Sequence, residues 1–265
     1  MSVRSASGVA ALVAALVAST ACTGSSSSGG STLAHGTLQS SVVAVGGGAE
    51  RRVAVYLPPG ALPRGSGGGY PTLYLLHGAG ADESQWPAIG VTDAADRLIA
   101  DGSIPPLVIV MPDIDADGQA VLDAVVPWAE AHLPVVPDAA HRAIGGISRG
   151  GATALRLASA RPYRFSRVGG HSPAVPDGGA LAQKLAAWGG PVWLDVGTHD
   201  SLKQRVGLLS STLEGDGTVA QFHLYDGGHN RDYWGAHVAD YLRFYGGSGG
   251  VDGGQVDDQA GAAQG

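Results

Sequence analysis

Short apolar runs alternate with helical patterns along most of this chain, and this alternation constrains the fold more than any other feature. Residues 72–76 and 107–111 are continuous apolar runs, typical of strands buried on both faces of a sheet. Residues 52–57 alternate and end at Pro58, as an exposed antiparallel strand does. Further strand signals lie at residues 143–144, 191–194 and 221–225.

Helical periodicity fills the intervals between these runs. The predicted helices lie at residues 91–100, 122–133, 152–160, 181–188 and 234–245. Pro127 predicts a kink or a late start in the second of them. Alternating strands and helices favour an α/β fold in which a mostly parallel sheet carries helices on both faces. Ligands of such sheets bind beyond the carboxyl ends of the strands, so we expect the site in the loops that follow the strands.

Glycine-rich segments bound the folded part of the chain, which has 43 glycines among 265 residues. Residues 1–21 are typical of a secretory signal, with a basic residue, an apolar run and then small residues. We expect a flexible Gly/Ser-rich tether at residues 22–40 and a disordered acidic tail at residues 247–265. One domain is left, at residues 41–246.

Cys22 is the only cysteine of the chain, which excludes a disulfide framework and any Cys-based zinc site. Its position after Ser19-Thr20-Ala21 resembles a bacterial lipoprotein signal, in which the cysteine becomes the lipidated first residue, although Ser19 stands where Leu is usual. The alternative is an ordinary signal peptide cleaved after Ala21, which leaves a free thiol. Both alternatives predict an exported protein, and only a lipid on Cys22 would attach it to a membrane.

The charge pattern excludes two classes of partner. The net charge is −7, and no cluster of Lys and Arg interrupts the acidity. Binding of nucleic acid or of an anionic membrane surface needs such a cluster, so we expect neither.

A G-x-S-x-G pattern at residues 146–150 supplies the candidate nucleophile, Ser148. The pattern alone carries little weight in a glycine-rich chain, because residues 246–250 match it in the tail. The position of Ser148 between a strand signal and a helix is typical of a nucleophile elbow, in which glycines allow a sharp turn and the serine lies at a helix N-terminus. A phosphate-binding loop or a plain turn is the alternative, but the lysine of a P-loop is missing.

An activated serine needs a base and an acid that orients the base, usually in the chain order Ser, acid, His. Asp200 lies in a loop after an apolar run, whereas Asp195 lies inside that run and is a less favoured acid with a structural role as its alternative. His229 follows another strand signal and precedes the last helix, which makes it the preferred base. The less favoured histidines lie in a strand, on the last helix and beside the acid; they are His223, His237 and His199.

Two backbone amides are expected to bind the oxyanion of such a site. One is the amide of Arg149, directly after the nucleophile, and the other is that of Ala79 in the loop after residues 72–76. His77 in the same loop lacks companion metal ligands at suitable spacing, so we expect it to hold the loop by hydrogen bonds.

Loops near the nucleophile also supply candidate substrate contacts, namely Trp86, Asp113, His171, Ser172 and Trp234. Aromatic residues there could stack on a sugar or an aromatic acyl group, although the helical spacing of Trp234 with Val238 fits a core position as well. No insertion is long enough for a large lid, which predicts an open cleft. The Arg149 side chain either crowds the pocket or attracts an anionic substrate.

Five motifs keep a family order through the chain: LLHGAGADESQW at 75–86, VMPD at 110–113, GISRGG at 146–151, DVGTHD at 195–200 and GGH at 227–229. Over residues 40–246 the chain resembles the putative esterase family of α/β-hydrolases, which includes feruloyl, acetylxylan and enterochelin esterases, S-formylglutathione hydrolases and mycolyltransferases. The resemblance implies the α/β-hydrolase fold, a triad of Ser148, Asp200 and His229, and no metal or organic cofactor. Arg149 departs from the usual Met or Leu, and His77 stands where mycolyltransferases carry Asp, which favours the hydrolase branch.

The expected function is therefore that of a secreted or lipid-anchored serine esterase, which hydrolyses small-molecule or carbohydrate-linked carboxylic esters, including those of aromatic acids. An acyltransferase of the same fold is one alternative. A catalytically silent binding lipoprotein is the other.

Overall fold

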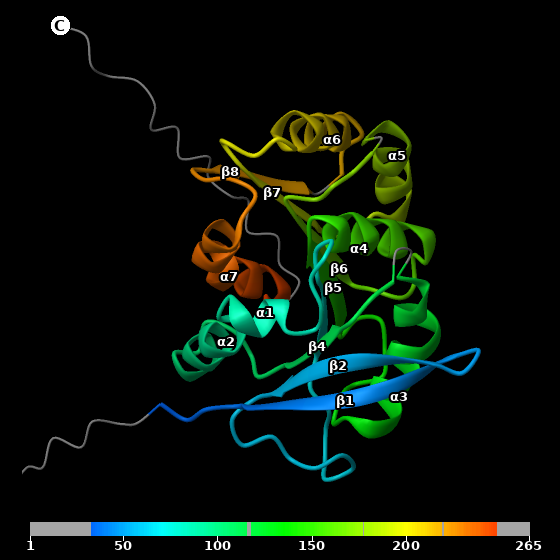
Figure 1. Cartoon of the computed structure of the whole chain (residues 1–265), viewed down its shortest axis with the longest axis vertical. Coiled ribbons are helices and arrows are strands. Elements are labelled where there is room, and N and C mark those ends of the chain that lie inside the picture. Colours follow the sequence, from blue (N-terminus) through cyan, green and yellow to red (C-terminus); the bar gives the residue numbers. More distant parts are fainter. Residues whose placement is uncertain (1–32, 116–117, 177, 219, 248–265) are drawn as a thin grey trace, which may run out of the picture. The chain divides into compact units, whose positions relative to one another are not determined.

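An eight-stranded sheet organises the part of the chain that the computed structural model describes, residues 33–115, 118–176, 178–218 and 220–247 (Figure 1). The predicted signal segment, Cys22, most of the predicted tether and residues 248–265 lie outside the described residues. The strand order is β1-β2-β4-β3-β5-β6-β7-β8. The β1–β2 and β2–β4 pairs are antiparallel, and the remaining pairs are parallel. The strands are β1 Thr37–Gly46, β2 Ala49–Leu57, β3 Thr72–Leu76, β4 Val108–Pro112, β5 Arg142–Ile147, β6 Arg167–His171, β7 Val192–Gly197 and β8 Ala220–Tyr225.

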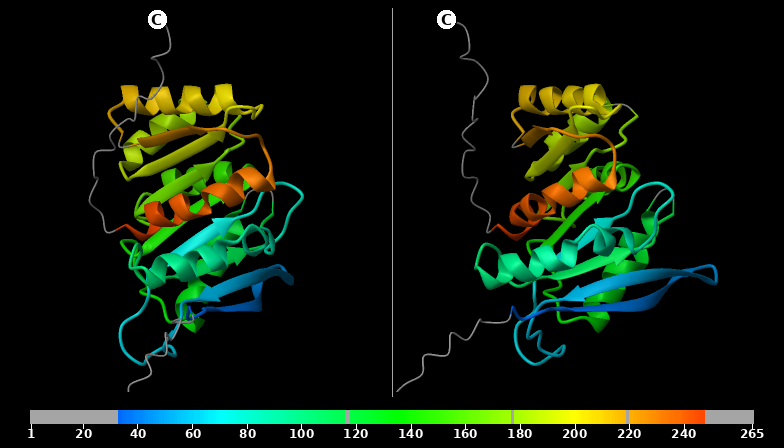
Figure 2. Two further views of the ribbon diagram at one scale, coloured as in Figure 1. Left: turned by 90° about the vertical axis from the view of Figure 1, so that its left-hand side faces the viewer. Right: turned by 60° about the vertical axis from the view of Figure 1, so that its left-hand side comes forward.

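Helices cover both faces of the sheet, as the alternating pattern predicts (Figure 2). They are α1 Gln85–Ala88, α2 Val91–Ala100, α3 Val126–His132, α4 Arg149–Ala160, α5 Gly178–Trp188, α6 Lys203–Gly215 and α7 Arg231–Gly246. One core cluster joins α3, α4, α5 and α6 to one face, and the other joins α1, α2 and α7 to the opposite face. Alternate residues of β3 enter the two clusters, Tyr74 the first and Leu75 the second. The α/β-hydrolase fold without a lid is therefore confirmed for the described residues.

Several elements differ from the prediction. The β1 strand begins at Thr37, inside the segment expected to be tether, because its polar residues suit an outer strand that pairs only with β2. The β2 strand is antiparallel as expected but buried rather than exposed at Val53–Tyr56, since β1 and β4 flank it on both sides. The α3 helix starts late: Pro127 lies in its first turn, after a π-helical segment at Val121–Val125.

The carboxylate of Asp195 ties β6, β7 and α7 together inside the protein. Its Oδ1 accepts hydrogen bonds from the hydroxyls of Tyr233 (2.9 Å) and Tyr241 (3.0 Å). Its Oδ2 accepts from Nδ1 of His171 (2.6 Å) and Nε1 of Trp193 (2.8 Å). Burial, followed by the negative charge of Asp195, raises the pKa of both tyrosines, so both remain protonated donors. Both oxygens of the Asp195 carboxylate thus have hydrogen-bond donors, and the residue has a structural role.

We expect Asp195→Asn to lower the free energy of unfolding by about 3 kcal/mol, because the new amide group turns an N–H toward donors that then lack an acceptor. Denaturant unfolding measures this difference. Asp216→Asn, at the exposed end of α6, is the matched control and should change stability by less than about 0.5 kcal/mol. Equal losses in the two variants would contradict the structural role of Asp195.

Candidate active site

The chain turns sharply at Ser148, between β5 and α4. Ser148 has φ +54° and ψ −115°, an uncommon conformation for a residue other than glycine. Hydrogen bonds hold it there: its amide donates to the carbonyl of His171 (2.9 Å), and its own carbonyl accepts from the amides of Ala152 and Ala174 (both 3.0 Å). The turn presents the serine at the start of α4, as predicted for a nucleophile elbow.

Close backbone packing explains the glycines on either side of Ser148. A Cβ atom on Gly146 would lie 2.4 Å from the carbonyl carbon of Gly150. A Cβ on Gly150 would lie 2.4 Å from the carbonyl oxygen of Leu76, at the end of β3. No side chain fits at either position, so the first turn of α4 lies directly against the loop that follows β3.

Ser148, His229 and Asp200 form one continuous chain of hydrogen bonds. Nε2 of His229 lies 3.0 Å from Oγ of Ser148, and its Nδ1 lies 2.8 Å from Oδ2 of Asp200. The Asp200 side chain is fully buried, whereas that of His229 is 33% exposed. A carboxylate that accepts the Nδ1 proton leaves Nε2 free to accept the serine proton. The arrangement can therefore generate a serine nucleophile.

The loops after β7 and β8 support each other and so fix the acid relative to the base. The amides of Thr198 and His199 donate to the carbonyls of Tyr225 and Gly227 (both 2.8 Å). The free oxygen of the Asp200 carboxylate, Oδ1, accepts from the amide of Leu202 (2.8 Å). The position of His229 is thus set by the loop that orients Asp200.

The less favoured candidates lie elsewhere. Asp195 is occupied by the four donors described above. His223 is stacked on Trp193, with a centroid distance of 3.9 Å, and burial lowers the pKa of its imidazole. His237 is stacked on Tyr225, and the exposed His199 lies 3.5 Å from Asp226.

The two expected oxyanion donors flank Ser148. Among the described residues, the amides of Ala79 and Arg149 have no acceptor. The amide of Arg149 belongs to the open N-terminal turn of α4, where helix amides lack partners. The loop that carries Ala79 lies beside the serine, since a Cβ on Gly78 would be 3.6 Å from Cβ of Ser148. The unpaired amides of Ala79 and Arg149 therefore lie near the hydroxyl of Ser148.

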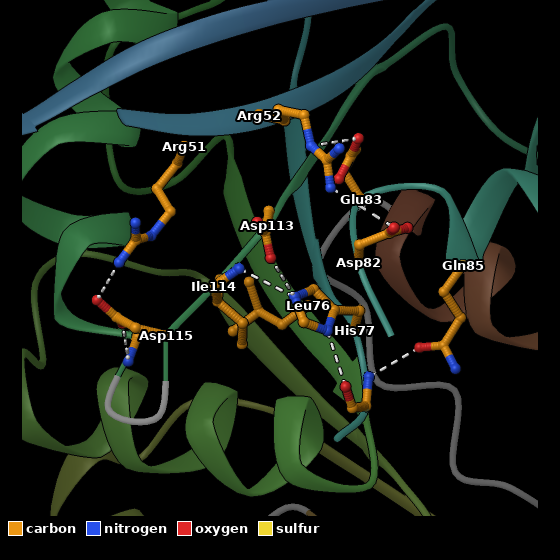
Figure 3. A network of polar contacts seen from close by, with 12 residues as sticks. Arg51, Arg52, Leu76, His77, Asp82, Glu83, Gln85, Asp113, Ile114 and Asp115 are labelled. Atoms are coloured by element: carbon orange, nitrogen blue, oxygen red, sulfur yellow. Dashed lines mark hydrogen bonds and ion pairs between the residues drawn. The ribbon is translucent and has the colours of Figure 1, made fainter. Parts of the chain in front are cut away.

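Hydrogen bonds fix the two successive peptide groups on either side of Gly78 (Figure 3). Nδ1 of His77 donates to the Gly78 carbonyl (2.8 Å), and the Gly78 amide donates to Oε1 of Gln85 (2.7 Å). Because a trans peptide is planar, fixing the Gly78 oxygen also fixes the opposite direction of the Ala79 N–H. Nε2 of the buried His77 accepts from the amide of Ile114 (2.9 Å), which anchors it to the loop after β4. Sequence reasoning anticipates the role of His77 but not that of Gln85, since nothing in a sequence shows where an amide side chain points.

Four of the five expected substrate contacts are buried, and Trp234, at 6% exposed, is the least buried of the four. Trp86 is 1% exposed and donates Nε1 to the Leu76 carbonyl, whereas His171 and Ser172 are both 0% exposed. These positions do not support contact with a substrate: Trp86 and His171 pack in the core below the site, where α7 covers the sheet. Asp113 keeps a 35% exposed side chain beside His77, and Trp234 packs edge-on against the ring of His229.

A small hollow lies next to Gln85, and a larger cavity lies elsewhere; neither is lined by a member of the triad. The hollow, of about 250 Å³, is lined by Ala81, Asp82, Ser84, Gln85, Ala88 and Arg231. It adjoins the site through Gln85, which holds Gly78, and through Arg231, which starts α7 after His229. A cavity of about 440 Å³ near the amino ends of β3, β5 and β6 contains no member of the triad. The open cleft expected near the nucleophile stays a prediction, since neither hollow is lined by Ser148.

Comparisons with known proteins identify the family of this chain. The model of a family described as "Putative esterase" matches residues 46–245. A protein of Xylanibacter ruminicola named "Endo-1,4-beta-xylanase/feruloyl esterase" is 31% identical over 133 residues, 43% of this chain and 18% of that protein. A Mycobacterium tuberculosis protein named as an esterase is 30% identical over 127 residues, 41% of this chain and 26% of that protein. This chain thus spans about a quarter or less of the length of these curated relatives.

Solved structures of other proteins have the same fold as this chain. A ferulic acid esterase superposes with a TM-score of 0.72 at 22% sequence identity, covering 80% of this chain and 98% of that one. At this identity, the likeness establishes the fold alone.

We expect a fluorophosphonate probe to label Ser148, because such probes phosphonylate a serine that a neighbouring base activates. His229→Ala and Asp200→Asn should slow labelling by roughly a hundredfold or more. His199→Ala is the matched control, because His199 adjoins Asp200 in the chain but does not contact Ser148, and it should label at the normal rate. Gel fluorescence with peptide mass analysis gives the rate and the site; a label on another serine would contradict the geometry.

Proposed function

The chain belongs to the putative esterase family of α/β-hydrolases, and from this premise we propose that it hydrolyses carboxylic esters with Ser148 as its nucleophile. The observation that carries the proposal is the unbroken hydrogen-bond chain from Asp200 through His229 to Ser148, with two unpaired amides beside the serine. A silent binding protein would have no need for this combination.

In the first half of the proposed reaction, Nε2 of His229 takes the hydroxyl proton of Ser148 as Oγ forms a bond to the ester carbonyl carbon. The carbonyl oxygen becomes negative and accepts hydrogen bonds from the amides of Ala79 and Arg149. Asp200 stabilises the imidazolium without taking its proton. His229 then gives the proton to the departing alcohol, and the acyl group stays on Ser148.

In the second half, water gives a proton to His229 and attacks the acyl carbon. The acid leaves, and Ser148 regains its proton from His229. The exposed face of His229 and the absence of a lid over the described site favour water as the acceptor. Both features support a hydrolase over an acyltransferase.

The proposed substrates are small-molecule or carbohydrate-linked esters, including esters of aromatic acids. The names of the relatives support this class, since two of them mention ferulic or feruloyl esters. The hollow beside Gln85 supports a substrate that enters from the protein surface. Stacking on Trp86 has no part in the proposal, because that ring is buried.

We expect hydrolysis of 4-nitrophenyl acetate by the purified protein and a loss of kcat/KM of roughly a thousandfold or more in Ser148→Ala. Asp200→Asn should lower the rate by roughly a hundredfold to ten-thousandfold, because the histidine loses its orienting carboxylate. Circular dichroism controls for folding, and product analysis with a competing alcohol separates hydrolysis from transfer. Unchanged turnover in Ser148→Ala would rule out the assignment.

We also propose that the chain is exported and carries a lipid on Cys22. The support is the sequence alone: a basic residue, an apolar run and small residues precede Cys22, and residues 23–36 lie between it and β1. No helix in the described part of the chain is long and apolar enough to cross a membrane.

Expression in a bacterial host tests the anchor. We expect the protein to fractionate with membranes, to show the mass of a diacylglyceryl-modified Cys22, and to become soluble in the export medium or periplasm on Cys22→Ala. An unmodified Cys22 in exported protein would contradict lipidation and leave the signal segment as an ordinary one.

A further inference from the structure

We infer that the side chain of Arg149 selects esters that carry an anionic group, such as a carboxylate, close to the scissile bond. The inference rests on the proposed function and deepens it by naming a substrate class. It concerns the side chain of Arg149, whereas the proposed mechanism uses only its backbone amide.

Arg149 is an unpaired cation next to the nucleophile. It directly follows Ser148 in the chain, and its side chain is partly buried. Its Nε is buried and donates to nothing among the described residues. None of the ion pairs of the described chain involves Arg149. A buried guanidinium N–H without a protein acceptor is unfavourable, so a substrate group that accepts from Nε would be stabilising.

Its position on α4 makes the charge more unfavourable. Arg149 is the first residue of the helix, where the helix dipole disfavours a cation, and the first turn of α4 contains no acidic residue to offset it. An anionic group bound at this place would pair with the guanidinium and also interact favourably with the helix N-terminus. One anionic ligand group would therefore offset both the missing acceptor of Nε and the unfavourable position of the cation at the helix N-terminus.

Acidic residues of the neighbouring loops are already engaged (Figure 3). Arg51 pairs with Asp115 (3.0 Å), and Arg52 pairs with Glu83 (3.0 Å) and Asp82 (3.6 Å). These pairs balance the arginines of β2 and leave Arg149 uncompensated. The chain has a net charge of −7. An unpaired cation beside the nucleophile therefore favours binding of a negatively charged group at this place.

The guanidinium fork favours a planar carboxylate, which it can bind through two parallel N–H···O bonds. The amide and the side chain of Arg149 share one Cα, so groups of a substrate near the carbonyl that the amide binds lie within the length of an arginine side chain from that Cα. The carboxylate can belong to the acyl part, as in a monoester of a dicarboxylic acid, or to the alcohol part. The shared chemistry is an ester with a negative charge near the carbonyl.

Two matched pairs of esters test the inference and separate the two sources of charge. Monomethyl succinate is compared with methyl pentanoate for the acyl side, and 3-acetoxybenzoate with phenyl acetate for the alcohol side. The measured quantity is the ratio of kcat/KM for the charged ester to that for the neutral ester, within each protein. This ratio cancels any general loss of activity in a variant.

We expect the wild type to favour the charged member of at least one pair, and Arg149→Met to lower that ratio about tenfold. Arg149→Lys should keep part of the preference, because it keeps the charge and loses the fork. Arg164→Met is the charge-matched control: Arg164 is exposed between α4 and β6, near the amino ends of the strands, and its loss should leave the ratio unchanged.

Equal ratios in the wild type and Arg149→Met for both pairs, with the neutral esters hydrolysed, would overturn this inference and leave the proposed function standing. An equal fall in Arg164→Met would also overturn it, because the effect would then be one of net charge. No hydrolysis of either member of either pair by the folded wild type would overturn the proposed function itself.

Discussion

The close approach of the first turn of α4 to the end of β3 is the constraint on which the site depends. The approach requires that Gly150 have no side chain, because a Cβ there would lie 2.4 Å from the Leu76 carbonyl oxygen. It brings the loop that carries Ala79 close to Ser148 and to the first turn of α4, where the amide of Arg149 lies. The orientation of the Ala79 amide is then set by His77 through the Gly78 carbonyl. One packing contact between backbones thus brings together donors that lie far apart in the chain.

The other half of the site depends on the parallel pairing of β7 with β8. These strands end side by side, and amides of the loop after β7 donate to carbonyls at and after the end of β8, so that Asp200 and His229 face each other although they come from different loops. The core beneath them is held by Asp195, which Tyr233 and Tyr241 of α7 contact directly. Loops that are anchored to the ends of rigid strands therefore carry Asp200 and His229.

The sequence predicts the parts of this structure that have a strong local signal. The buried runs at β3 and β4, the elbow at Ser148 and the order of the triad follow from apolar patterning and glycine spacing. The β6 strand has no such signal, because two of its residues are glycines whose Cβ positions are taken by neighbours such as the hydroxyl of Tyr245. The sequence offers Trp86 and His171 as candidate substrate contacts because they lie in or beside loops expected near the nucleophile. The tertiary packing of α7 against the sheet, which local patterns do not contain, places both inside.

Two Asp–His pairs of similar geometry differ in the features that support a reactive role for one of them, as proposed above. Nδ1 of His171 lies 2.6 Å from Asp195, and Nδ1 of His229 lies 2.8 Å from Asp200. Nε2 of His171 meets the hydroxyl of Tyr245, whose pKa is raised well above its usual value by complete burial, whereas Nε2 of His229 meets the hydroxyl of Ser148 beside two unpaired amides. The first pair is fully buried, so a substrate cannot reach it. Its Nε2 contacts a buried hydroxyl and has no unpaired amide donors beside it among those described above. The Asp–His contact is similar in both pairs. Access of a substrate to the histidine and the presence of oxyanion donors therefore distinguish the pair that we propose to be catalytic.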